Sequence, residues 1–178
     1  MRARRAPILL PLAALLACGK PPERGARAGE GSGYSVEARR KTDAGLSFVP
    51  PNTWGTKPPS SSTRLAEYAI PRAAGDGADG ELALSYFGEG QGGTVEMNLD
   101  RWIGQFQQPD GSSSKGKAKV DRRKVADLPV TIVEVSGRFV SKAMFPGQRD
   151  YDEAGWRLHA AIVETAKGPF FLDRKSVV

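Results

Sequence analysis

Alternation of apolar and polar residues with a period of two is the pattern that most constrains how this chain can fold. It occupies residues 64–70, 81–87 and 156–165. A strand buried on one face shows this period, because successive side chains point to opposite faces of a sheet. The Gly- and Asp-rich turn between the first two runs predicts that they pair as antiparallel strands. The residues expected to face inward are Ala66, Tyr68, Ile70, Leu82, Leu84, Tyr86, Trp156, Leu158, Ala160 and Ile162.

Four further segments are predicted to be strands of the same domain. They are residues 46–49, which Pro50 and Pro51 terminate, and residues 117–126, 129–140 and 169–172. The segment at residues 129–140 is apolar enough to be a central strand.

One segment has the period of an amphipathic helix instead. Starting at residue 95, apolar side chains recur at i, i+4, i+7, i+8 and i+11. Thr94 is a suitable N-cap, and the acid at Glu96 is favoured in a first helical turn. The apolar positions are Val95, Leu99, Trp102, Ile103 and Phe106. The predicted fold class is therefore α+β, a mostly antiparallel sheet with one inserted amphipathic helix.

The N-terminus has the pattern of an export signal. Three arginines within residues 2–5 precede an apolar run at residues 8–17. The run is too short for a membrane-spanning helix, which needs roughly 20 apolar residues. Cys18 follows the run directly and is the only cysteine of the chain, so it cannot form an intramolecular disulfide. A lone thiol at this place is suited to lipid attachment.

The segment Leu15-Leu16-Ala17-Cys18 resembles the lipobox of bacterial lipoproteins. The resemblance implies cleavage between Ala17 and Cys18, a thioether-linked diacylglycerol on Cys18, and acylation of the new amino group. Two or three acyl chains anchor a protein stably, because each buried CH₂ contributes about 0.8 kcal/mol. Gly19 in place of aspartate favours the outer over the inner membrane, by analogy with enteric sorting. An ordinary secreted protein with a cysteine in its signal is the alternative.

These features divide the chain into four parts. Residues 1–17 are the predicted signal peptide, and residues 18–33 are the lipidated cysteine and a flexible tether rich in Gly, Pro and charge. Residues 34–172 form a single globular domain. Residues 173–178 (DRKSVV) match what a widely used sequencing adapter encodes in one reading frame. We therefore expect this tail to be non-biological and a C-terminal helix beyond Leu172 to be missing. A genuine polar tail is the alternative.

Composition argues against a nucleic-acid partner. The formal net charge is +6, from 26 Lys and Arg against 20 Asp and Glu. Removing residues 1–17 takes away three arginines, and removing residues 173–178 takes away one Arg, one Lys and one Asp, which leaves 21 basic and 19 acidic residues. The short basic clusters at residues 39–41 and 122–124 contain no aromatic residue on which bases could stack.

A glycine-rich segment at residues 88–93 matches the G-x-G-x-x-G pattern of dinucleotide-binding loops. It lies between a predicted strand and the predicted helix, as such a loop requires. The alternating polarity of that strand and the carboxylate of Glu89 argue against phosphate binding. We predict no cofactor, and a candidate binding loop formed by Gly88, Gly90, Gly92 and Gly93.

No catalytic site and no metal site is predicted. His159 is the only histidine, and we expect it on the exposed polar face of its strand, together with Arg157. One histidine without a second cysteine does not make a zinc site. The acidic residues elsewhere lack the spacing of a calcium loop and are assigned to turns and solvated loops. They are Asp76, Asp79, Glu81, Asp150, Asp152 and Glu153.

From about residue 45 to residue 172, the chain resembles a group of uncharacterised bacterial lipoproteins and hypothetical exported proteins. In that group the chain continues past the last strand into a terminal helix. The spacing of Phe48, Pro51 and Trp54 is also similar to that of Mog1/PsbP-like domains, which are α/β/α sandwiches of binding and assembly factors. Neither resemblance supplies a catalytic residue. The first resemblance rests on residues 45–48, 51, 54, 64–66, 68, 88–93, 98–102, 105–106 and 161–165.

These observations predict a non-enzymatic lipoprotein of the cell envelope, facing the periplasm. Its partners would be the lipid bilayer, through acylated Cys18, and an envelope protein or a small ligand. The alternative is an exported hydrolase with a site built from Asp, Glu or Ser in loops. A folded structure that placed His159 beside a carboxylate and a serine in a cleft would favour the hydrolase. A structural spacer of the envelope is a third hypothesis.

Overall fold

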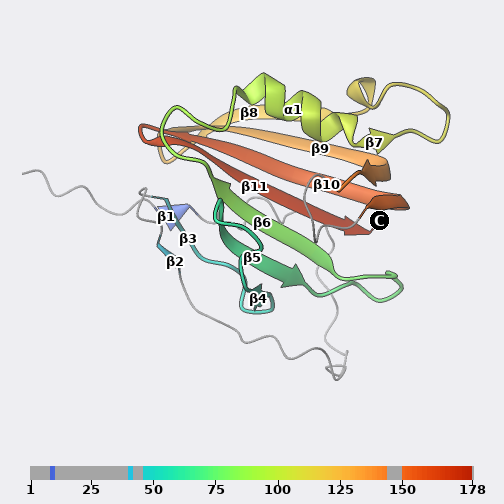
Figure 1. Ribbon diagram of the computed structural model, residues 1–178, viewed down its shortest axis with the longest axis horizontal. Helices are drawn as coiled ribbons and strands as arrows, with labels where there is room; N and C mark the ends of the chain where they lie inside the picture. The colour runs from blue at the N-terminus through green and yellow to red at the C-terminus, as the bar shows by residue number, and fades with distance from the viewer. Residues whose placement is uncertain (1–8, 11–39, 42–45, 144–149, 178) are drawn as a thin grey trace, which may run out of the picture.

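The computed structural model describes residues 9–10, 40–41, 46–143 and 150–177. These residues form one eight-stranded antiparallel sheet, a ten-residue helix that lies across one of its faces, and a small sheet of three two-residue strands (Figure 1). The small sheet has the order β1 (Leu9–Leu10), β3 (Ser47–Phe48) and β2 (Arg40–Lys41).

Strands distant in sequence lie side by side in the large sheet. The longest strands, β10 and β9, pair as neighbours, and β7 and β8 share the outer edge of β9. The segment predicted to be central, β9, therefore lies next to edge strands, whereas β11 and β10 occupy the middle. The order is β4 (Gly55–Lys57), β5 (Arg64–Ile70), β6 (Gly80–Tyr86), β11 (Gly168–Val177), β10 (Tyr151–Thr165), β9 (Leu128–Ser141) and β7 (Phe106–Gln107), with β8 (Lys119–Val125) beside β9.

The predicted α+β class is wrong. The described residues form one extensive antiparallel sheet with a single short α-helix, α1 (Val95–Gly104), so the fold is close to all-β. The Thr94 side chain accepts a hydrogen bond from the Met97 amide at 3.2 Å and caps the helix start. The helix ends sooner than its apolar period suggests, because Phe106 belongs to β7 and pairs with Phe139 of β9.

Both faces of the sheet are buried over its centre. On one face, α1 packs through Leu99, Trp102 and Ile103 onto strand residues that include Val133, Leu158 and Ile162. β10 contributes to both faces, and its residues 160–163 are all buried. A strand buried on two sides loses strict alternation, which explains the run of apolar residues at the end of β10.

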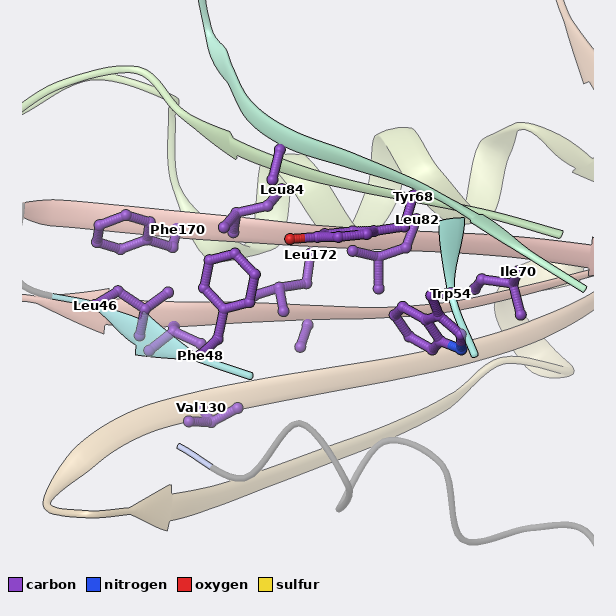
Figure 2. Packing of buried hydrophobic residues seen from close by; sticks show 13 residues of the cluster. Leu46, Phe48, Trp54, Tyr68, Ile70, Leu82, Leu84, Val130, Phe170 and Leu172 are labelled. Carbon is purple, nitrogen blue, oxygen red and sulfur yellow. The ribbon is translucent and has the colours of Figure 1, made fainter. Parts of the chain in front are cut away.

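The opposite face of the sheet carries a second apolar cluster (Figure 2). Tyr68 of β5 lies at its centre, in edge contact with Phe48 at a ring-centroid distance of 6.3 Å and beside Trp54 at 6.0 Å. Trp54 and Phe48 precede the large sheet in sequence, so the segment before β4 covers this face. The other labelled members of the cluster are Leu46, Ile70, Leu82, Leu84, Val130, Phe170 and Leu172.

The last two long strands extend beyond their predicted limits. β10 begins at Tyr151 rather than at Trp156, and β11 continues to Val177 rather than ending at Leu172. Residues 173–177, predicted to be a non-biological tail, pair with residues 156–160 of β10. Within the structure these residues form an ordinary part of a strand.

Candidate functional site

A groove of about 510 Å³ opens at the end of the sheet where α1 begins. Four strands and the start of the helix contribute to it, so residues far apart in the sequence meet there. The lining residues are Gly93, Thr94, Val95, Glu96, Arg122, Arg123, Pro129, Val130, Thr131, Ile162, Glu164, Thr165 and Pro169.

The floor of the groove is a row of side chains on the helix-covered face of the sheet. Arg122 of β8 lies opposite Thr131 of β9, and Thr131 lies opposite Ile162 of β10. Thr131 is only 4% exposed, and it lines the groove together with Ile162.

Charged groups line the rim of the groove. Arg122 lies 3.7 Å from the Glu96 carboxylate, and Arg123 forms an ion pair with Asp121. Glu164 is exposed and has no ion-pair partner within the described part of the chain. The groove therefore contains two arginines that form ion pairs with neighbouring carboxylates, and one carboxylate, Glu164, that forms no ion pair with a described residue.

The candidate loop glycines have a clear structural role beside this groove. Gly88, Gly90, Gly92 and Gly93 all have positive φ, a conformation that glycine adopts without strain. Only Gly93 of the four lines the groove. A Cβ at Gly92 would lie 2.8 Å from the Phe171 ring, so glycine is also needed there for close packing. Ligand binding by this loop stays a prediction.

A buried asparagine connects the glycine loop to the helix through hydrogen bonds. The Asn98 side-chain amide donates to the Gly92 carbonyl at 2.7 Å and to the Thr94 carbonyl at 2.9 Å. Its carbonyl oxygen accepts from Arg101 at 2.9 Å. These hydrogen bonds connect the end of the loop to the first turns of the helix beside the groove.

Gly168 supports the same loop from the β10–β11 turn. Its φ is +110°, and a Cβ would lie 2.7 Å from the Gly88 carbonyl oxygen.

We expect Gly168→Ala to destabilise the domain by about 1–3 kcal/mol, the usual cost of a strained backbone conformation. Urea unfolding measures this change. Gly104→Ala is the control, because a Cβ there meets no atom within 4 Å, and unchanged or higher stability is expected. Equal effects of the two substitutions would contradict the prediction.

A second groove of about 570 Å³ lies between the end of α1 and residues 106–115. Several of its polar side chains have partners: Ser114 donates to the Phe106 carbonyl at 2.6 Å and accepts from Gln108 at 2.9 Å. Lys115 forms an ion pair with Asp100 at 2.8 Å. These polar groups are occupied in shaping the loop, which makes this groove the weaker candidate.

His159 is half-buried, not exposed as predicted, although it shares a sheet face with Arg157 as expected. It lies opposite Glu134 of β9 and Arg174 of β11. Burial, Arg174 and Arg157 lower the pKa of His159, and the Glu134 charge opposes them in part. The lowered pKa favours the neutral imidazole at neutral pH.

This arrangement meets only part of the condition for the hydrolase alternative. A carboxylate does lie beside His159, but the Ser136 hydroxyl accepts a hydrogen bond from Arg157 at 3.3 Å. His159 lines neither groove.

The acidic residues at positions 76, 79 and 150 hold turns and loops as predicted, whereas Glu81, Asp152 and Glu153 lie in strands rather than in turns or loops. Asp76 and Asp79 accept hydrogen bonds from backbone amides of their own turn, and Asp150 accepts one from the Ala143 amide. Asp152 pairs with Arg138, whose hydrogen bond lowers the pKa of the aspartate. Within the described ranges, no set of three or more His, Cys, Asp or Glu side chains is arranged to hold a metal ion.

The predicted lipidation residue Cys18 and the cleavage residue Ala17 lie outside the described residues. Within the part of the chain that the structure describes, no helix has the length and hydropathy that a membrane span requires. Compared with known proteins, the sequence matches no protein-family model, and no curated protein matches it significantly. The resemblances of the sequence to lipoproteins and to Mog1/PsbP-like domains therefore remain hypotheses.

Proposed function

We propose that this chain is a non-enzymatic lipoprotein of the cell envelope whose sheet domain binds a small ligand in the groove beside the start of α1. The observation that carries the binding role is the groove itself, in which four strands and the start of α1 bring apolar side chains together with Arg122, Thr131 and Glu164. Ligand sites typically combine an apolar lining with a few polar groups of this kind.

The anchoring role is supported by the lipobox-like residues 15–18. The tether that follows has about 15 residues, and a flexible chain of this length has a root-mean-square reach of about 20 Å. Such a tether keeps a folded domain clear of the lipid headgroups. In the proposed arrangement, the acylated Cys18 is inserted in the bilayer, in the outer rather than the inner membrane, and the domain faces the periplasm.

Lipidation at Cys18 is tested by palmitate labelling in a bacterial host. We expect the wild-type protein to incorporate labelled palmitate and to sediment with membranes. Cys18→Ala is expected to lose the label completely and to move to the soluble fraction, because the substitution removes the only attachment sulfur. Labelling followed by fractionation measures both properties.

Two results would contradict the proposed lipid anchor at Cys18. One is a wild-type protein that takes up no label, and the other is a Cys18→Ala protein that stays in the membrane fraction. Ser47→Ala, in which the only cysteine is kept, serves as the control for the labelling.

A further inference from the structure

The strand β8 forms a long free edge of the large sheet. It pairs with β9 in one continuous register, from Lys119 opposite Glu134 to Val125 opposite Leu128. Among the described strands β8 has no second neighbour, and six of its seven residues are exposed. In an antiparallel ladder, every second residue directs its N–H and C=O groups away from the partner strand. β8 therefore presents a row of backbone donors and acceptors to the solvent.

The opposite edge of the sheet is much shorter. β4 has only three residues, Gly55–Lys57, so it offers little backbone to a further strand. β8 is more than twice as long, contains no proline, and shows no bulge in its pairing with β9. A short, bulged or proline-containing edge resists the addition of a strand, whereas a long and regular edge accepts one. The geometry of β8 thus allows an extended peptide to add to the sheet.

The side chains of β8 select the charge of such a peptide. Its acidic residue, Asp121, is already paired with Arg123, and Arg122 lies 3.7 Å from the Glu96 carboxylate. The two lysines of the strand are exposed and form no ion pair with a described residue. The edge therefore keeps an excess of positive charge, which attracts an acidic partner. The cationic residues of β8 are Lys119, Arg122, Arg123 and Lys124.

Charge also decides between a second copy of this chain and a different partner. Antiparallel pairing of two β8 strands would double the positive excess along one ladder, and like charges placed across a ladder are destabilising. An acidic strand would instead find cations on both of its faces, because side chains alternate along β8. Lys119 and Arg123 lie on one face of the sheet, and Arg122 and Lys124 lie on the other.

We propose that β8 is the docking strand for an acidic, extended segment of a partner protein. Main-chain hydrogen bonds to the free edge hold the segment beside β8, and its carboxylates pair with Lys119 and Lys124. This inference goes beyond the proposed function, since it assigns a protein partner to the edge of the sheet and does not require a ligand in the groove.

Fluorescence anisotropy with two labelled peptides tests the inference on the full chain in detergent micelles. Both peptides have the sequence Glu-Glu-Thr-Thr-Glu-Glu-Thr, which places two carboxylates on each face of an added strand. The second peptide is N-methylated at every backbone amide, so it keeps the charge but cannot donate hydrogen bonds to β8. We expect the first peptide to bind at least about tenfold more tightly than the second.

Two results would overturn the proposal. No binding of the first peptide at about 1 mM would mean that the charges of β8 only protect the edge from other strands. Equal binding of the two peptides would mean that the edge attracts any polyanion, such as a nucleic acid or an anionic membrane, without pairing as a strand.

Substitutions then test whether the lysines of β8 select the peptide. Lys119→Gln combined with Lys124→Gln should raise the Kd of the first peptide by about five- to tenfold, because two exposed ion pairs are lost. Arg72→Gln combined with Lys167→Gln removes the same charge from the exposed β5–β6 and β10–β11 connections, and this control should leave the Kd nearly unchanged. Equal weakening by the two double variants would contradict a site on β8.

Hydrogen exchange of the same complex locates the peptide. An added strand supplies acceptors for the free amides of β8, so exchange within residues 119–125 should slow with the first peptide and stay unchanged with the second. Slower exchange elsewhere, without a change in β8, would exclude this edge as the docking site. Palmitate labelling is independent of these measurements, so a failure of peptide binding does not bear on the lipid anchor.

Discussion

Trp102→Ala should lower the free energy of unfolding by about 3–5 kcal/mol, the usual cost of removing a large aromatic side chain from a core. Trp102 is 1% exposed and is the largest fully buried side chain among the residues that the structure describes. Its ring meets Phe171 of β11 edge-on at a centroid distance of 6.3 Å, which ties α1 to the middle of the sheet. Denaturant unfolding followed by circular dichroism measures the change.

The matched control for this substitution lies on the same helix. Met97 is 65% exposed, so Met97→Ala should change the stability by no more than about 0.5 kcal/mol. Both substitutions introduce alanine into α1, so helix propensity affects them in the same direction. A Trp102→Ala protein as stable as Met97→Ala would show that α1 does not depend on this contact.

Glu67→Gln should destabilise the domain by about 1.5–3 kcal/mol, the usual contribution of hydrogen bonds to a charged group. Glu67 is 5% exposed, and one of its oxygens accepts from the Ser60 amide at 2.8 Å, the Ser60 hydroxyl at 2.6 Å and Arg64 at 2.9 Å. These bonds fasten the loop before β5 to the strand. Urea unfolding at neutral pH measures the loss.

The same substitution should also reduce the pH dependence of stability. Burial alone would raise the pKa of Glu67, but the hydrogen bonds from Ser60 and Arg64 outweigh burial and hold the pKa below its ordinary value of 4.5. The contribution of the carboxylate is therefore complete above the ordinary value and is lost as the pH falls through the lower, folded-state value. The stability difference between the wild type and Glu67→Gln should shrink on acidification.

Glu81→Gln on β6 is the control for both measurements. Glu81 pairs with Lys57 at 2.8 Å, but its side chain is well exposed, so the substitution should cost less than about 1 kcal/mol. A stability difference between the wild type and Glu67→Gln that stayed constant on acidification would mean that Glu67 does not titrate as described.

Short-range patterns were sufficient to place most of the elements. The alternation at residues 64–70 and 81–87 identified β5 and β6. In a strand that is buried on one face, every second side chain points to the core and is apolar. Thr94 marked the helix start, since a cap depends on the first turn of its own helix. The fold class was wrong because eight strands join in one sheet on which only one ten-residue helix packs, and this joining depends on strand pairing rather than on local patterns.

In the candidate site, too, some residues could be predicted from local sequence patterns, whereas others could be placed only by the tertiary structure. The glycine loop was visible in the sequence because its residue type and spacing are local, yet only Gly93 of the predicted loop residues lines the groove. Thr131 carries no local signal, because a threonine within an apolar strand is ordinary, and its place in the groove becomes evident only when the strands are assembled.

The sequence by itself therefore determined the local structure, because the strand periods, the helix cap and the turn residues each depend on neighbours a few positions away. Tertiary packing alone decided which strands occupy the middle, which residues are buried on both faces, and which polar groups meet at the start of α1. The physical reason is that Arg122, Thr131, Ile162 and Glu164 lie on three different strands, and their proximity follows from strand register rather than from sequence spacing.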